Sequence, residues 1–389
     1  MSPDTKTPAI AFIDLAAQRR RLGSRIDRAI AAVLEHGQYI LGPEVTELER
    51  RLAEFSGAKH AITCANGTDA IQLVLLALGI GPGDAVFVPG FTFVATAEVV
   101  ALAGATPVFV DVDRESFNLD APSLAAAIPE AKRRGLQPRA VIAVDLYGQP
   151  ADYAAIENIA AEHGLTVIAD AAQSFGAALG GKRVGALTRF TTTSFYPAKP
   201  LGCYGDGGAI FTDDDGAAEL LKSLRYHGKG GHQYENVRVG MNSRLDTLQA
   251  AILIPKLEIF GDEIEARQRV AQRYEDGLGD VACVPRIRAG AKSAWAQYTL
   301  VVEGRDQLIA ACRAAGVPTA IHYPIPLHKQ AGYAAFPTSP AGLPNCEWLS
   351  SRVVSLPMHP YLDAHTQDRI ISVLRDALQP PMAKAAARG

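Results

Sequence analysis

The 389-residue chain lacks several features that would assign it to common classes of protein. Its five cysteines show no Cys-x-x-Cys spacing, which indicates reduced thiols, with neither a disulfide framework nor a metal site. No apolar run approaches the length of a membrane span. The first residues, 1–8, are polar and lack the apolar region of a signal peptide. These absences predict a cytoplasmic protein that does not enter a membrane.

An excess of charge of one sign is also missing. The net charge is −3, and acidic and basic residues are interspersed, so we expect no basic surface for nucleic acid. The length exceeds what one hydrophobic core ordinarily serves and predicts two domains. We place a large α/β domain over residues 1–250 and a smaller C-terminal α+β domain over 251–389. The end of the chain, 380–389, is rich in proline, alanine and basic residues and is expected to fray.

Apolar, mostly β-branched segments alternate with helical patterns along the first half of the chain. The expected strands are 60–65, 84–90, 106–113, 140–148, 166–172, 189–196 and 207–213, and the expected helices are 67–79, 94–104, 121–134 and 150–163. This alternation predicts a seven-stranded, mostly parallel sheet covered on both faces. A short loop joins the last two strands, which predicts one antiparallel pairing. A long helix over 244–276 follows, then a strand at 296–302 and helices at 306–315 and 364–378.

The most informative segment, 194–210, places Lys199 on a proline-flanked loop next to four glycines. An amine on a stiff loop beside a phosphate-sized concavity suits a lysine that forms a Schiff base with pyridoxal phosphate. Asp170 ends the apolar strand before it, and acids at the carboxyl ends of such strands point into ligand crevices. A carboxylate there can keep the pyridine nitrogen of this cofactor protonated. Taken alone, Lys199 could be a surface charge and Asp170 a strand-end cap.

Two further segments complete the expected cofactor site. Gly67 and Thr68 open a helix after an apolar strand, where free N–H groups bind phosphate, and Ser194 is a second phosphate donor. Phe93 follows another strand, where its ring can stack on a pyridine. The alternatives are an ordinary capped helix and a packed core aromatic.

Taken together, these motifs resemble the nucleotide-sugar aminotransferases of the DegT/DnrJ/EryC1/StrS family. The segments that carry the resemblance are 64–70, 91–98, 170–176, 194–210, 240–246 and 322–324, within a match that runs from about Phe12 to about Leu362. Within the family, segments 37–44, 199–204, 243–249 and 355–360 are most similar to UDP-2-acetamido-2-deoxy-ribo-hexuluronate aminotransferases. Those enzymes contribute to 2,3-diamino-uronic sugars of bacterial O-antigen, a part of lipopolysaccharide.

The resemblance implies a fold type I aminotransferase and a role for each cofactor residue. Lys199 would be the Schiff-base lysine and the acid and base of the proton shift, and Asp170 would hold the pyridine N–H. Gln173 would touch the 3-oxygen of the ring, and Phe93 would stack on it. The family also supplies an asparagine from the neighbouring subunit of a homodimer, and Asn242 matches it.

Substrate residues follow less directly from the motifs. A guanidinium matches a carboxylate best, so Arg244 from the neighbouring subunit is the expected clamp for glutamate and for a uronic acid. An exposed arginine paired with Asp246 is the alternative. His322 and Tyr323 either line the sugar pocket or form a structured turn, and His227 lies on a glycine-rich loop that could close over the nucleotide.

The resemblance implies that L-glutamate gives its amine to the cofactor and leaves as 2-oxoglutarate. The amine then goes to C3 of a UDP-linked 3-keto-2-acetamido-hexuronic acid. Three alternatives stay open: an aminotransferase for a 4-keto-6-deoxy sugar, a sugar dehydratase, and a non-catalytic nucleotide-sugar-binding regulator. Such a dehydratase carries a histidine in place of the lysine, so Lys199 argues against it.

Overall fold

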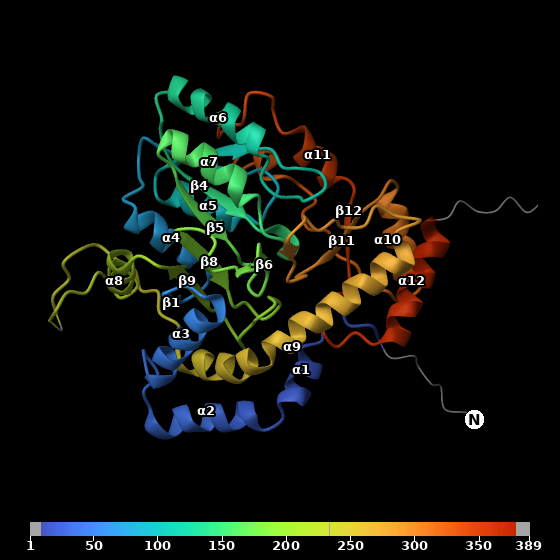
Figure 1. Ribbon diagram of the computed structural model, residues 1–389, viewed down its shortest axis with the longest axis horizontal. Coiled ribbons are helices and arrows are strands. Elements are labelled where there is room, and N and C mark those ends of the chain that lie inside the picture. The colour runs from blue at the N-terminus through green and yellow to red at the C-terminus, as the bar shows by residue number, and fades with distance from the viewer. Residues whose placement is uncertain (1–8, 233, 379–389) are drawn as a thin grey trace, which may run out of the picture.

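A seven-stranded sheet forms the centre of the computed structural model, which describes residues 9–232 and 234–378 (Figure 1). Its order is β1 (His60–Cys64), β9 (Gly208–Thr212), β8 (Phe190–Ser194), β5 (Thr166–Asp170), β4 (Gln137–Val144), β2 (Asp84–Pro89) and β3 (Thr106–Val110). Neighbouring strands from β8 to β3 are parallel. β9 runs antiparallel to β8, as predicted, and also to β1. The expected mostly parallel sheet is therefore confirmed.

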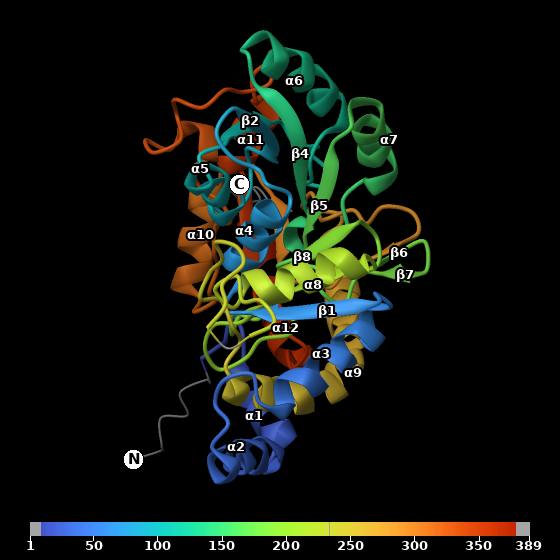
Figure 2. The same ribbon diagram turned by 90° about the vertical axis from the view of Figure 1, so that its left-hand side faces the viewer.

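Helices cover both faces of this sheet, which is why its strands read as continuous apolar runs. One face packs against α4 (Gly67–Ala77), α5 (Ala95–Leu102) and α8 (Asp215–Leu224). The other packs against α6 (Ala121–Arg133) and α7 (Tyr153–His163), and α3 (Pro43–Ser56) and α9 (Thr247–Leu278) cover it near β1 and β9. Figure 2 shows α4 and α5 on one side of β4 and β5, with α7 on the other.

The long helix α9 links the sheet to a smaller α+β part of the molecule (Figure 1). Its second half packs on a two-stranded sheet of β11 (Tyr298–Val301) and β12 (Val353–Leu356), together with α10 (Arg305–Ala314) and α12 (Ala364–Leu378). Tyr274 of α9 contacts Tyr298 there, with ring centroids 4.9 Å apart. The smaller α+β part matches the expected fold class, and the division of the chain at residue 250 stays a prediction.

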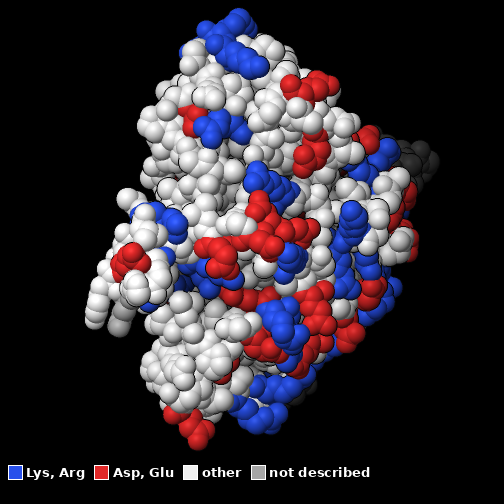
Figure 3. Space-filling model, turned by 60° about the vertical axis from the view of Figure 1, so that its left-hand side comes forward, with Lys and Arg blue, Asp and Glu red and all other residues white. Residues whose placement is uncertain are grey.

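The remaining elements are short or lie at the periphery. They are α1 (Leu15–Leu22), α2 (Arg25–His36), the turns η1 (Leu146–Gly148) and η2 (Leu327–Lys329), α11 (Pro344–Ser350), and a small sheet of β10 (Ala291–Lys292), β6 (Ala178–Leu179) and β7 (Lys182–Arg183). The expectations for segments 1–8 and 380–389 lie outside the described residues. Within residues 9–232 and 234–378, no helix is long and apolar enough to cross a membrane. On the face drawn in Figure 3, acidic and basic side chains are interspersed.

Strand direction determines where the functional residues meet. β1, β8, β5, β4 and β2 all run the same way, so their carboxyl ends lie at one edge of the sheet. Gly67, Ser194, Asp170, Tyr147 and Phe93 occur at or just after these ends. In open α/β sheets this edge is where ligands bind.

Candidate active site

Asp170, the last residue of β5, is a buried acid at this edge, with 7% of its surface exposed. Its Oδ2 accepts a hydrogen bond of 2.9 Å from Thr96 Oγ1, and its Oδ1 accepts one of 3.2 Å from the Ala172 N–H. Burial raises the pKa of Asp170, whereas these two hydrogen bonds and the nearby Lys199 oppose that rise. The carboxylate is therefore held in place and would be stabilised by a cationic partner.

Lys199 lies on the tight loop between β8 and β9. The loop is closed by hydrogen bonds from the Lys199 N–H to the Tyr196 carbonyl (2.8 Å) and from the Cys203 N–H to the Phe195 carbonyl (2.7 Å). Burial lowers the pKa of the Lys199 amine, and Asp170 partly offsets the change. A lower pKa leaves more neutral amine near neutral pH, as a nucleophile or a general base requires.

The start of α4 lies against the end of β8. A Cβ atom added at Gly67 would lie 2.7 Å from Ser194 Cβ, and one added at Gly208 would lie 2.4 Å from the Asn66 carbonyl oxygen. Only glycine allows these close approaches. The chain therefore brings the first turn of α4 and the hydroxyl of Ser194 into one small cup.

This cup has the donors that a phosphate needs. The side chain of Asn66 caps α4 by accepting from the Asp69 N–H at 2.8 Å, which leaves Gly67 and Thr68 as the first helical residues. N–H groups at these positions have no partner within a helix. The Ser194 Oγ accepts from the Tyr196 N–H at 3.2 Å, so its own proton can point to a ligand.

Aromatic and amide side chains also lie at this edge of the sheet. Gln173 is buried; its Oε1 accepts from the Tyr147 N–H at 2.6 Å, and its Nε2 donates to the Tyr323 hydroxyl at 3.3 Å. The Phe93 ring lies 6.3 Å from that of Tyr323, and 52% of Phe93 is exposed. Phe93 is thus not the packed core aromatic that the sequence left open, and its ring is available for stacking.

These residues fit pyridoxal phosphate. The first turn of α4 and the Ser194 hydroxyl suit the phosphate, and the buried Asp170 suits a protonated ring nitrogen. Lys199 supplies the amine, and Phe93 a free aromatic ring. Within the described residues, no cluster of histidine, cysteine and acidic side chains could hold a metal ion.

His322 and Tyr323 also reach this edge. His322 Nδ1 lies 3.1 Å from Ser355 Oγ, and the His322 carbonyl accepts a hydrogen bond from the Tyr147 hydroxyl. Burial and the neighbouring Lys199 lower the pKa of His322. The structure therefore brings both residues of this pair to the lysine site.

Asn242, Arg244 and His227 are placed differently. Arg244 Nη2 donates to Asn242 Oδ1 at 2.5 Å, and its guanidinium lies 5.0 Å from the centroid of the Tyr226 ring. Asn242 and His227 are exposed. Among the hydrogen bonds and ion pairs of the described residues, none links these three side chains to Lys199 or Asp170, and none pairs Arg244 with Asp246.

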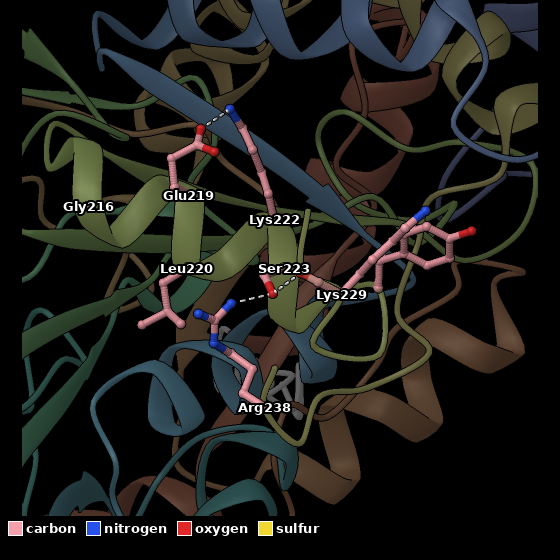
Figure 4. Close-up of a pocket in the computed structure, with 9 residues that line it drawn as sticks. Gly216, Glu219, Leu220, Lys222, Ser223, Lys229 and Arg238 are labelled. Carbon is pink, nitrogen blue, oxygen red and sulfur yellow. Dashed lines mark hydrogen bonds and ion pairs between the residues drawn. The ribbon is translucent and has the colours of Figure 1, made fainter. Parts of the chain in front are cut away.

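Two open cavities flank the segment that carries His227. One, of about 510 Å³, lies between α8 and this segment and is lined by Lys222, Ser223, Lys229 and Arg238, among others (Figure 4). The other has the same volume and includes His227. Lys199 lines neither of them, but it borders a cavity of about 20 Å³. Cavity size alone therefore does not locate Lys199.

Sequence reasoning missed two residues that organise the site. Thr96 binds Asp170, and Tyr147 links Gln173 to His322. Thr96 lies in the same motif as Phe93. Tyr147 comes three residues after the end of β4, at φ 60°, a conformation uncommon for a non-glycine residue. The signal in the sequence was that both residues lie in segments that follow the carboxyl end of a strand, β2 for Thr96 and β4 for Tyr147.

Residues 20–375 match the DegT/DnrJ/EryC1/StrS aminotransferase family, so the chain belongs to this family of enzymes. It is 56% identical to the UDP-2-acetamido-2-deoxy-3-oxo-D-glucuronate aminotransferase of Pseudomonas aeruginosa, over 91% of this chain and 96% of that protein. Membership confirms the resemblance inferred from the motifs.

Two solved structures extend the comparison. A DegT DnrJ EryC1 StrS aminotransferase from Brucella abortus is 54% identical, with a TM-score of 0.94 over 95% of this chain and 100% of that one. NtdA from Bacillus subtilis, solved with bound cofactor PMP, is 28% identical, with a TM-score of 0.86 over 97% of this chain and 87% of that one. The fold is thus shared along nearly the whole chain.

Proposed function

We propose that this enzyme uses pyridoxal phosphate to transfer the amine of L-glutamate to C3 of a UDP-linked 2-acetamido-3-keto-hexuronic acid. It would act in the cytoplasm, in the synthesis of diamino-uronic sugars for bacterial surface polysaccharide. The observation that carries the proposal is the meeting of Lys199, Asp170 and the Gly67 cup at one sheet edge. The 56% identity to an aminotransferase named for such a sugar supports the choice of acceptor.

Asp170 prepares the site for electron uptake. When bound, pyridoxal phosphate supplies a carbonyl carbon for the amine and a ring that takes up an electron pair from the neighbouring carbon. Asp170 would hold the proton on the ring nitrogen. The hydrogen bonds from Thr96 and the Ala172 N–H orient the carboxylate and oppose the rise in its pKa that burial causes.

Lys199 would transfer the proton at the reacting carbon of the substrate. Its amine would join the cofactor covalently in the resting enzyme and be freed by the incoming donor. The freed amine would carry a proton from the Cα of glutamate to the cofactor in the first half-reaction, and from the cofactor to C3 of the sugar in the second. Burial of Lys199 favours the neutral amine that this role requires.

Arg244 and Asn242 would serve the neighbouring subunit of a homodimer. The two side chains are linked to each other by a hydrogen bond, and no described hydrogen bond or ion pair links either of them to Lys199 or Asp170. From the partner, the Arg244 guanidinium could clamp the carboxylate of glutamate and then that of the uronic acid. His322 and Tyr323 would line the sugar pocket, and His227 would approach the nucleotide.

The test is a comparison of acceptors. The pyridoxamine-phosphate form of the purified protein is mixed with 3-keto UDP-sugars that differ only at C6, as carboxylate, alcohol or methyl. Loss of a charged contact in a partly buried site costs roughly 2–5 kcal/mol, so the carboxylate should react at least about 30-fold faster. NMR of the product should show the new amine at C3. Equal rates with a 4-keto-6-deoxy sugar would overturn the acceptor assignment.

The donor is tested separately. L-Glutamate should convert the pyridoxal-phosphate form to the pyridoxamine-phosphate form with release of 2-oxoglutarate. L-Glutamine and L-aspartate are the comparison donors. Faster conversion with either of them would replace glutamate in the proposal and leave the acceptor unaffected.

A further inference from the structure

Lys256 is a buried cation that the proposed chemistry does not use. It lies in α9 directly after Pro255, and only 1% of its surface is exposed. Its Nζ donates a hydrogen bond of 2.6 Å to the Gly202 carbonyl and lies 4.0 Å from the centroid of the Tyr204 ring. Both of these partners are uncharged. They belong to the end of the loop that carries Lys199.

A buried ammonium without a paired carboxylate is costly. An apolar side chain of similar volume would fill the same space at lower free energy. If Lys256 only packed α9 against the loop, a methionine would serve at least as well. The charge therefore needs an explanation beyond packing.

The tight turn at Gly202 gives the charge of Lys256 a structural role. A Cβ added at Gly202 would lie 2.5 Å from the Pro197 carbonyl oxygen, so the turn is closed tightly against itself. This closure directs the Gly202 carbonyl to α9, where a charged donor binds it more strongly than a neutral one. Lys256 thus joins the longest helix of the molecule to the loop, three residues beyond Lys199.

We propose that Lys256 is a positioning residue for Lys199, acting through its hydrogen bond to the Gly202 carbonyl. This inference rests on the proposed role of Lys199. It assigns to α9, which forms no part of the cofactor cup, the task of holding the reactive amine at a defined place. Lys256 touches neither substrate nor cofactor in this proposal.

The surroundings of Lys256 give it a distinct pH signature. Burial lowers the pKa of Lys256 to about 8, with Cys203 and Glu263 opposing the change. Burial raises the pKa of the Cys203 thiol to about 11 and also raises that of the Tyr204 phenol. Glu263, one percent exposed, accepts hydrogen bonds from Gln18 and Tyr361. Among Lys256 and the neighbours named here whose pKa is shifted, Lys256 is the group that changes charge between pH 7 and pH 9.

The sign of the stability effect follows. The unfolded chain keeps the lysine protonated up to its ordinary pKa of about 10.5, whereas the folded chain releases the proton from about pH 8. Between these values the unfolded state binds more protons, so this group makes folding more favourable as pH rises. Lys256→Met should therefore raise the Tm at pH 7, and the difference from the wild type should shrink towards pH 10.

The direct test is hydrogen exchange in the cofactor-free, full-length protein. In Lys256→Met the Lys199 and Cys203 amides, which close the loop, should exchange at least about tenfold faster than in the wild type. Lys256→Gln keeps an N–H donor without the charge and should give an intermediate rate. Lys222→Met is the control for loss of a lysine at the surface and should leave these amides unchanged.

Measurements of kcat and KM distinguish a role of Lys256 in positioning Lys199 from a purely structural role. With cofactor bound, Lys256→Met should lower kcat by about tenfold and change the KM for the sugar by less than about twofold. Unchanged exchange at Lys199 and Cys203, or an unchanged kcat, would overturn the inference. If the wild type shows no transamination, the proposed function fails, and the exchange result still decides whether Lys256 holds the loop.

Discussion

The lysine edge and the Arg244 region differ in how completely one chain builds them. At the edge, hydrogen bonds link Gln173, Tyr147, Tyr323 and His322 to one another. Asp170 is held separately, by hydrogen bonds from Thr96 and from the Ala172 N–H. Asn242 and Arg244 bind each other, but no described hydrogen bond or ion pair joins them to that network. The first group is ready to bind a cofactor within one subunit. Under the proposed function, the second group would act on the site of a neighbouring subunit.

This contrast yields a ranking of mutational effects. Substituting a residue of the network should lower activity in every assembly state, because its hydrogen-bond partners are in the same chain. Substituting Asn242 or Arg244 should lower activity only where the neighbouring subunit does not supply the missing side chain.

Lys199→Ala should produce the largest loss. It removes both the covalent attachment and the general base, and positioned acid–base groups alone contribute about 10²–10⁴-fold. We expect turnover to fall by at least about 10³-fold, with the fold retained. In the wild type, borohydride should bleach the cofactor absorbance and fix the cofactor on the peptide that contains Lys199. Turnover by Lys199→Ala within tenfold of the wild type would contradict the assignment.

Asp170→Asn should come next. The amide keeps the size of the side chain but removes the charge that holds the ring proton, so we expect at least about a hundredfold loss of turnover. Asp145→Asn is the matched control, since Asp145 is a buried acid that follows the adjacent strand. It accepts hydrogen bonds from Ser174 and Tyr153, and burial raises its pKa to about 7. A larger loss in Asp145→Asn than in Asp170→Asn would reverse the assignment.

How much could be predicted from sequence is clear from particular residues. The alternation of apolar strands and helices gave the parallel sheet, and strand ends located Asp170 and Gly67. Thr96 was missed because its hydrogen bond joins it to a carboxylate 74 positions away. The β6–β10 pairing was missed because only two residues of each strand take part and more than a hundred residues separate them. Such long-range contacts leave no periodic pattern.

Some misses had a local signal. α8 begins after Asp214, whose side chain accepts from the Ala217 N–H at 3.0 Å, and its apolar residues recur at helical spacing. α3 begins at Pro43 after a glycine, a common helix start. Both helices pack against the sheet, and neither is among the helices that the apolar pattern predicts. The residues at these helix starts are therefore the local sequence signal that predicts α8 and α3.

Arg244→Ala should lower kcat/KM by roughly 30-fold or more, the lower end expected for a lost charged contact. Its distinctive property is complementation. Lys199→Ala and Arg244→Ala subunits, mixed and reassembled, should regain about a quarter of wild-type activity, because half of the dimers would contain one intact site. Activity that stays at the level of the separate mutants in verified heterodimers would place Arg244 in the site of its own chain, or outside any site.

Thr96→Val should have the smallest effect and tests the inner network most finely. Thr96 donates to the Asp170 carboxylate and lowers its pKa, so removing the hydroxyl should raise that pKa further above its ordinary value. Activity that needs ionised Asp170 is lost as pH falls through this pKa. The acidic limb of the kcat/KM profile should therefore move to higher pH. A hydrogen bond to a charged group is worth about 1.5–3 kcal/mol, so the loss at neutral pH should be about tenfold.

Thr92→Val is the matched control for this shift. Thr92 is buried next to Thr96, with the two hydroxyl oxygens 3.3 Å apart, but it makes no described hydrogen bond to Asp170. The same substitution there should leave the acidic limb nearly in place. If both variants moved the limb equally, the shift would reflect general loosening of α5, and the hydrogen bond from Thr96 would lose its assigned part in keeping Asp170 ionised.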